Sequence, residues 1–128
     1  MIEYILDTHV LLWLIFDSEK LSDTARRVLS NDFARKYICV SSLWEISIKN
    51  RIGKLPLPEG TQSILSAVRA RGFGIIGLDY LHIEAYNALP LIHRDPFDGI
   101  IIATALIEEM TILTADENIQ KYEVPWAW

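Results

Sequence analysis

The sequence predicts an α/β fold in which helices cover both faces of a central, mostly parallel sheet of four or five strands. Short apolar segments of strand length alternate along the chain with segments whose apolar residues recur at helical spacing. This alternation is typical of parallel sheets covered by helices. The 128 residues, 51% of them hydrophobic, suffice for one core. No repeat, low-complexity tract or long linker divides them, so we expect one domain over residues 1–128.

Strands are expected where short apolar runs rich in β-favouring residues stop at a polar residue or a turn. These runs lie at residues 2–6, 37–40, 74–78 and 111–114. Residues 123–128 are a candidate fifth strand. Pro125 restricts that strand to an edge, because proline has no backbone N–H to donate.

Helices are expected at residues 8–16, 22–32, 42–52, 61–71, 81–88 and 96–109, with a short helix near Asn118. Ser22 is a favourable N-cap, and Gly53 suits the position after a helix end. The segment 96–109 is apolar on nearly all sides, which is typical of a helix buried at the centre of a domain.

Charge and cysteine content exclude several classes of protein. Twelve basic residues against seventeen acidic ones give a formal net charge of −5, which argues against binding nucleic acid through a broad basic surface. The single cysteine, Cys39, excludes a disulfide framework and a cysteine-based zinc site, and we expect it in the core. No apolar run reaches the roughly 18 residues of a membrane span, and the N-terminal residues lack signal-peptide features. We therefore expect a cytoplasmic protein without membrane association.

Acidic residues recur where the predicted strands end. Asp7 follows the first strand, and Asp116 lies two residues beyond the fourth. Glu45 lies in the first turn of the helix after the second strand, and Asp95 and Asp98 open the apolar helix. In open α/β sheets the carboxyl ends of the strands and the N-termini of the helices meet at one crevice. We expect these acids to converge there.

Each acid also has a simpler structural interpretation. Asp7, Asp95 and Asp116 are each placed to cap a helix, and the proline after Asp95 suits the first helical position. Ser42 and Glu45 match a capping box. Taken singly, capping is the better interpretation of every acid. Taken together, the acids favour a metal site, because caps need not converge and Ser or Thr would serve as well.

Several carboxylates held close together repel one another unless a cation neutralises them. Such oxygen ligands favour Mg²⁺ or Mn²⁺. A cation held in this way lowers the pKa of water and stabilises the charge of a phosphodiester transition state. The sequence has no Gly-rich phosphate loop, so it does not indicate a nucleotide triphosphatase.

Four stretches form an ordered set of motifs: residues 6–13 (LDTHVLLW), 41–49 (SSLWEISIK) continuing to 53–55 (GKL), 93–98 (HRDPFD) and 113–116 (LTAD). In this order and spacing they resemble a PIN domain, and more narrowly the VapC-type toxin ribonucleases of type II toxin–antitoxin pairs. The resemblance covers nearly the whole chain. It implies a Rossmann-like PIN fold and a metal-dependent endoribonuclease that hydrolyses RNA phosphodiester bonds.

The resemblance maps an acidic quartet onto Asp7, Glu45, Asp98 and Asp116. It implies that Asp7, Asp98 and Asp116 bind Mg²⁺ or Mn²⁺. Glu45 is implied to bind a second cation or to orient water. The resemblance also implies a homodimer and a cognate antitoxin whose tail covers the active site.

Residues around the quartet take part in the same resemblance. Thr8 and Thr114 match polar positions that line the site, and we assign Asp95 to capping and to support of the ligands. Arg94 is a candidate phosphate contact, with a solvated loop charge as the alternative. Relatives often carry a basic residue where this chain has Gly99, so we expect a phosphate or partner contact to be missing there.

Lys49 lies four residues after Glu45, which suits a surface ion pair on a helix. The alternative interpretation places Lys49, Arg51 and Lys54 along the path of the RNA.

The three histidines, His9, His82 and His93, are not spaced as a metal-binding set. His9 is expected to pack on its apolar helix, and Trp13 and Trp44 are expected in the core. The terminal tryptophans are expected to dock on the domain or to join an interface; they are Trp126 and Trp128.

Two other functions compete with this interpretation. A phosphatase of the haloacid dehalogenase type needs a second Asp two residues after its nucleophile, where this chain has His9. A catalytically silent PIN-like binding module would tolerate the loss of one acid, and all four are present. The sequence therefore favours an endoribonuclease toxin, with the binding module as the alternative.

Overall fold

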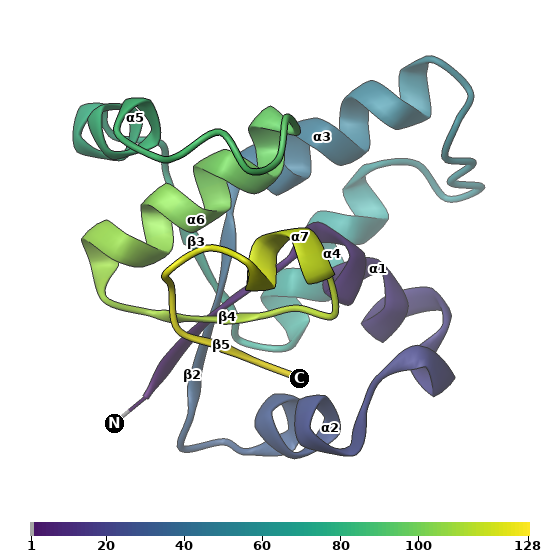
Figure 1. Ribbon diagram of the computed structural model, residues 1–128. Coiled ribbons are helices and arrows are strands. Elements are labelled where there is room, and N and C mark those ends of the chain that lie inside the picture. Colours follow the sequence, from purple (N-terminus) through teal and green to yellow (C-terminus); the bar gives the residue numbers. More distant parts are fainter. Residues whose placement is uncertain (1) are drawn as a thin grey trace.

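The computed structural model describes residues 2–128 and has a five-stranded, parallel sheet at its centre (Figure 1). Its strands are β1 (Glu3–Leu6), β2 (Arg35–Cys39), β3 (Gly74–Ile76), β4 (Thr111–Leu113) and β5 (Trp126–Ala127). They lie in the order β3-β2-β1-β4-β5, and every neighbouring pair is parallel. The predicted α/β fold is confirmed, and the terminal segment forms the edge strand expected from Pro125. The strand order reverses at β1, which places a crevice at the carboxyl ends of β1 and β4.

Helices cover both faces of this sheet. They are α1 (Thr8–Phe16), the 3₁₀ helix η1 (Ser18–Lys20), α2 (Asp23–Ser30), α3 (Val40–Arg51), α4 (Gln62–Ala70), α5 (Tyr80–Asn87), α6 (Pro96–Glu108) and α7 (Glu117–Gln120). In Figure 1, α1, α2 and α4 lie on one side of the sheet and α5 and α6 on the other. None of the helices within residues 2–128 is long and apolar enough to cross a membrane.

Alternate side chains of the strands point to two separate cores, one on each face. Leu6 and Leu113 pack with the apolar residues of α1, α2 and α4. Their neighbours Ile5 and Ile112 point the other way and pack against α6. Cys39 belongs to the second core and is fully buried, as expected. Because cores lie on both faces, the acids that follow the strands are placed at the carboxyl edge of the sheet.

The start of α3 differs from the sequence expectation. The helix begins at Val40 with Cys39 as N-cap, so Ser42 lies inside the helix and the expected capping box with Glu45 is wrong. The buried Ser42 hydroxyl instead accepts a hydrogen bond of 2.8 Å from the hydroxyl of Thr8 in α1. This contact joins two helices, and an apolar periodicity cannot reveal it. The N-cap Ser22 is confirmed, since its hydroxyl accepts a bond of 3.0 Å from the Ala25 amide.

Helix α6 is only partly the buried helix that was expected. Ile101, Ile102 and Ala105 are buried against the sheet, whereas Leu106 and Ile107 in the last turn are exposed. The apolar run of this helix therefore continues into a last turn whose apolar side chains are exposed.

The C-terminal residue docks on the domain, one of the two outcomes expected for the terminal tryptophans. The ring of Trp128 lies 5.7 Å from that of Trp13, between their centroids, and both are half-buried. Trp126 in β5 remains 44% exposed.

Candidate metal site at the carboxyl edge of the sheet

Asp7 and Asp116 follow two neighbouring strands, β1 and β4, and Thr114 lies between them. The Thr114 hydroxyl donates a hydrogen bond of 2.9 Å to Asp7 Oδ2 and accepts one of 3.0 Å from the Asp116 amide. Asp7 makes no side-chain capping bond to α1, although it occupies the N-cap position. Asp116 does cap α7, by accepting a bond of 2.8 Å from the Asn118 amide. Thr114 thus sets the positions of two acids of the quartet.

Asp98 reaches the same edge from the first turn of α6. Asp95 caps this helix, with Pro96 as its first residue, and accepts bonds from the amides of Phe97 and Asp98 at 2.9 and 3.3 Å. The capping role expected for Asp95 is therefore present. The Asp98 side chain is left to face the site, where Oδ2 lies 3.1 Å from Nε2 of His93.

Glu45 approaches from the second turn of α3 and is buried. Its Oε2 lies 2.7 Å from the ammonium of Lys49. This hydrogen bond is the main cause of a raised Lys49 pKa, to which the charges of Glu45, Asp95 and Asp98 add. The predicted spacing of the pair is right, but it is not a surface pair, because the carboxylate is buried and the ammonium lies within the field of the other acids.

The carboxylates are close enough to perturb one another strongly. The pKa of Asp98 is raised to about 8, mainly by burial and in addition by the charges of Asp7, Asp95, Asp116 and Glu45. Burial also raises the pKa of Asp7, against the hydrogen bond from Thr114, which favours the ionised form. Thr114 joins Asp7 to Asp116 by hydrogen bonds, and ligand atoms of Asp98 and Asp116 lie within 4.8 Å of each other. With Glu45 near enough for its charge to act on Asp98, the four acids meet at this edge.

Two buried carboxylate oxygens have no hydrogen-bond partner within residues 2–128. They are Asp7 Oδ1 and Glu45 Oε1. A buried polar atom without a partner costs free energy, about 1–3 kcal/mol and more for a charged group. Unpartnered oxygens among mutually repelling carboxylates fit the oxygen-ligand chemistry of Mg²⁺ or Mn²⁺.

His93 is a site residue that the sequence interpretation missed. One nitrogen of its ring and one oxygen each of Asp98 and Asp116 all lie within 4.8 Å of one another. The three histidines are indeed not a set by themselves, but this one joins two acids. Its position five residues before Asp98 is only a weak sequence signal. His93 lies in a loop, and a loop has no helical or strand periodicity that would predict where the ring points.

The remaining candidate residues lie around the acids. Thr8 is buried and contacts Ser42, as described above. Arg94 is exposed on the loop before α6. His9 is exposed, not packed away as expected, and its ring lies 6.2 Å from that of Trp13. His9 lines a hollow of about 220 Å³ together with Asp7, Trp13, Ala115 and Asp116.

Trp44 contradicts the expectation that it belongs to the core. Its side chain is 64% exposed, and its ring meets that of Phe97 edge-on with 5.5 Å between the centroids. Trp44 and Phe97 directly precede Glu45 and Asp98 in the sequence. An accessible aromatic pair therefore borders the acids on the side of α3 and α6.

The structure gives a reason for Gly99, where a basic residue was expected by resemblance. A Cβ at this position would lie 2.5 Å from Cε1 of Tyr86, because the ring of Tyr86 from α5 packs directly on α6 there. Any side chain at position 99 would have to displace that ring.

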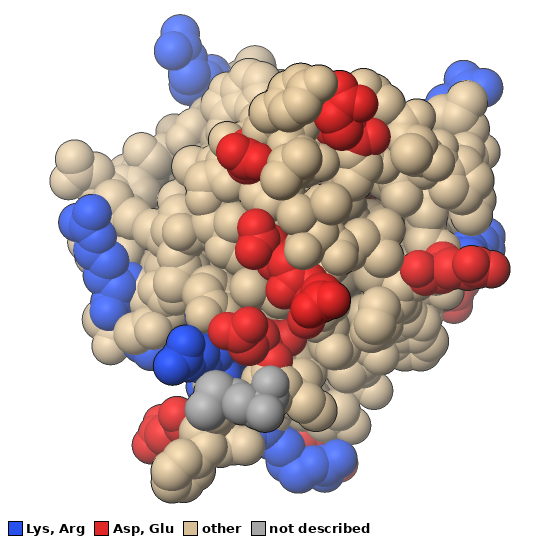
Figure 2. Space-filling view, turned by 90° about the vertical axis from the view of Figure 1, so that its left-hand side faces the viewer, with Lys and Arg blue, Asp and Glu red and all other residues tan. Residues whose placement is uncertain are grey.

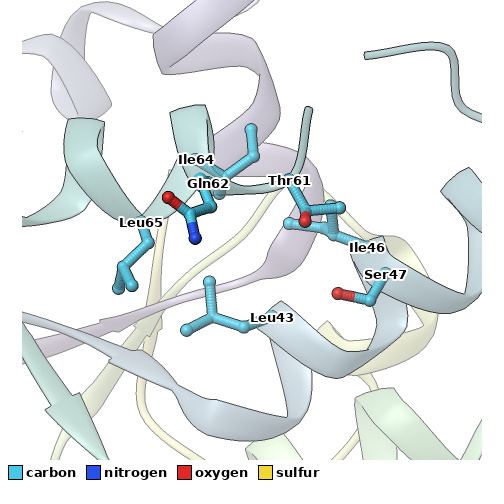
Figure 3. Close-up of a pocket in the computed structure, with 7 residues that line it drawn as sticks. All are labelled: Leu43, Ile46, Ser47, Thr61, Gln62, Ile64 and Leu65. Carbon is cyan, nitrogen blue, oxygen red and sulfur yellow. The ribbon is translucent and has the colours of Figure 1, made fainter. Parts of the chain in front are cut away.

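A second hollow, of about 190 Å³, lies between α3 and the start of α4 (Figure 3). Its walls are mostly apolar and include Leu43, Ile46, Ile64 and Leu65. None of the four acids lines it, so it is distinct from the candidate metal site.

Comparisons with known proteins agree with this architecture. A family model described as PIN domain matches residues 4–125. No curated protein matches the chain by sequence at a significant level.

Several solved structures share the fold. VapBC2 from Rickettsia felis, bound to a DNA fragment from its promoter, has a TM-score of 0.75 at 18% identity, with 99% of each chain covered. A toxin–antitoxin complex from Klebsiella pneumoniae has a TM-score of 0.69 at 18% identity, with 98% of this chain and 96% of that chain covered. VapBC-1 from nontypeable Haemophilus influenzae has a TM-score of 0.65 at 16% identity, with 98% and 97% covered.

Proposed function

We propose that this chain, which belongs to the PIN domain family, is a metal-dependent endoribonuclease and the toxin of a type II toxin–antitoxin pair. The observation that carries the proposal is the convergence of Asp7, Glu45, Asp98 and Asp116 at one edge of the sheet, where two buried oxygens lack partners within residues 2–128. Folding alone does not require buried carboxylates that repel one another, whereas a bound divalent cation makes this arrangement favourable.

In this proposal Asp7, Asp98 and Asp116 hold Mg²⁺ or Mn²⁺. A bound divalent cation makes water a stronger nucleophile at neutral pH and offsets the negative charge of the scissile phosphodiester. Thr114 orients Asp7 through its hydrogen bond to Oδ2. Glu45, whose Oε1 is free of protein partners among the described residues, orients water or helps to hold a second cation. Lys49 limits the repulsion between Glu45 and the other acids.

RNA is proposed to approach the carboxyl edge of the sheet. The opposite side of the molecule, at the left of Figure 1, carries a band of acidic side chains with basic ones at its margins (Figure 2). Phosphates are repelled from such a band, whereas a cation among the acids attracts them at the carboxyl edge. The exposed Arg94 is the proposed additional phosphate contact there, and Lys49 is a weaker candidate because it already pairs with Glu45.

An antitoxin is the proposed protein partner, and a homodimer in the cytoplasm is the proposed state. The support is the likeness in fold to chains of toxin–antitoxin complexes.

Cleavage of end-labelled total RNA tests the activity. We expect discrete cuts with Mg²⁺ that EDTA abolishes and that Asp7→Asn reduces at least about 100-fold, the usual scale for loss of a group that stabilises transition-state charge. Asp32→Asn is the matched control, since this exposed acid lies after α2, before the amino end of β2, and should cut like the wild type.

Equal cleavage by the wild-type and Asp7→Asn proteins would contradict the proposal. Cation binding without cleavage of any RNA would instead support the catalytically silent binding module.

A further inference from the structure

We propose that His93 is a nitrogen ligand of the cation, so that this site binds Mn²⁺ in preference to Mg²⁺. The inference rests on the proposed function only in placing a divalent cation among the acids. It changes the ligand set from carboxylates alone to carboxylates and one imidazole.

His93 lies at ligand distance from the acids. Nε2 of His93 lies 3.1 Å from Oδ2 of Asp98, and a ring nitrogen lies within 4.8 Å of ligand atoms of both Asp98 and Asp116. Two donor atoms about 2.1 Å from one cation and at right angles to each other are separated by about 3 Å. The spacing of imidazole and carboxylate therefore suits neighbouring ligands of a single ion.

The protein holds the backbone of His93 in place. The backbone N–H of His93 donates a hydrogen bond of 2.9 Å to the hydroxyl of Tyr122, and that hydroxyl lies 3.3 Å from the His93 carbonyl oxygen. Tyr122 is buried in the core beside α6, so the loop is tied to the body of the protein. Metal ligands need this kind of external support to keep their orientation.

Two further carboxylate oxygens at the site favour a cation independently of His93. Asp7 Oδ1 and Glu45 Oε1 are buried without a hydrogen-bond partner in the described part of the chain. Each belongs to a side chain less than 5% exposed.

The choice of ion follows from the donor atoms. Mg²⁺ prefers oxygen ligands and near-ideal octahedral geometry, whereas imidazole suits first-row transition metals. Mn²⁺ accepts carboxylates readily and tolerates a nitrogen ligand, so a mixed set favours it. We expect His93→Asn to weaken Mn²⁺ binding at least about tenfold, the scale on which loss of a group that supports a metal site is felt. Mg²⁺ binding should change much less.

Pulsed electron paramagnetic resonance of the full-length chain loaded with Mn²⁺ tests the ligand directly. We expect modulation from a nitrogen bound to Mn²⁺ in the wild type, a changed pattern when histidine is labelled with ¹⁵N, and loss of the signal in His93→Asn. His9→Asn is the matched control, because His9 lines the hollow beside Asp7 and Asp116 and is the competing imidazole; this variant should keep the signal. The labelled wild-type protein answers the question even if His93→Asn does not fold.

The outcomes separate the two proposals. Tight Mn²⁺ binding without nitrogen modulation would overturn ligation by His93 and leave the metal site standing, with His93 reduced to a hydrogen-bond donor to Asp98. Persistence of the signal in His93→Asn would also overturn it. Failure of the wild-type chain to bind Mn²⁺ at all, in calorimetric titration, would overturn both the ligand and the metal site.

Discussion

Among single residues, Asp98 and Asp7 weaken the folded state when they are ionised. Asp98 is the clearest case, because its buried carboxyl faces the charges of Asp7, Asp95, Asp116 and Glu45. Protonation of Asp98 relieves this repulsion in the metal-free protein. The effect of these proposed metal ligands on the free energy of unfolding therefore depends on pH and on whether a cation is bound.

This dependence leads to a prediction for the protein in EDTA. The pKa of Asp98 is about 8 in the folded state against an ordinary value of 3.8, so between these pH values the folded state holds a proton that the unfolded state has lost. The free energy of unfolding should then fall as pH rises through this window, because stability falls wherever the folded state binds more protons. The raised pKa of Asp7 acts in the same direction.

Thermal unfolding followed by circular dichroism measures this effect. A series from about pH 5 to about pH 8.5 covers roughly the window between the unfolded and folded pKa values of Asp98. We expect the Tm to fall with pH in EDTA, and we expect Asp98→Asn to have a flatter profile and a higher Tm than the wild type at the alkaline end. A wild-type Tm that stays constant or rises over this range would contradict the electrostatic account of Asp98.

The acids could be predicted from the sequence because position relative to a strand end is a local property. Asp7 and Asp116 directly follow or nearly follow predicted strands, and this alone placed them at one edge. The contacts of His93 and the exposure of Trp44 depend on neighbours distant in the chain, such as Tyr122 and Phe97. No periodicity of their own segments carries that information.

At the level of elements, the packing of α5 on α6 gives a stability prediction at Gly99. Gly99→Ala would place a Cβ 2.5 Å from the ring of Tyr86. Overpacking of this kind costs about 1–3 kcal/mol, which outweighs the gain of about 1 kcal/mol from better helix propensity. We expect a net loss of about 1 kcal/mol and a Tm several degrees lower.

The control for Gly99→Ala is the same substitution in a Tyr86→Ala background. With the ring removed, the propensity gain should remain, so the second substitution should stabilise the protein. A Gly99→Ala effect of the same sign and size in both backgrounds would show that Tyr86 is not the cause.

The elements themselves were largely predictable, whereas some of their ends were not. Helix α6 was located within one residue because its apolar run is long and Asp95 and Pro96 mark its start. Helix α3 begins two residues before the expected start. Ser42 accepts a hydrogen bond from the hydroxyl of Thr8 instead of capping its own helix. A polar side chain near a helix start has both options, and only the packing of α1 on α3 decides between them.

For the whole molecule, the order of the strands determines where function can reside. The sequence predicted a parallel sheet covered on both faces, but it did not predict the order β3-β2-β1-β4-β5. That order makes β1 and β4 neighbours, and it thereby joins Asp7 to Asp116 through Thr114 although they are far apart in the chain. Strand order depends on how the connections pack, which a pattern of apolar residues leaves open.

The central claim is that Asp7, Asp98 and Asp116 together hold a divalent cation at this edge. Anomalous diffraction at the manganese absorption edge, from crystals of the wild-type protein grown with Mn²⁺, tests it most directly. We expect a peak about 2.1–2.2 Å from oxygen atoms of these three residues, and its loss in crystals of Asp98→Asn. A fully loaded crystal with manganese peaks only elsewhere, or with none, would contradict the account.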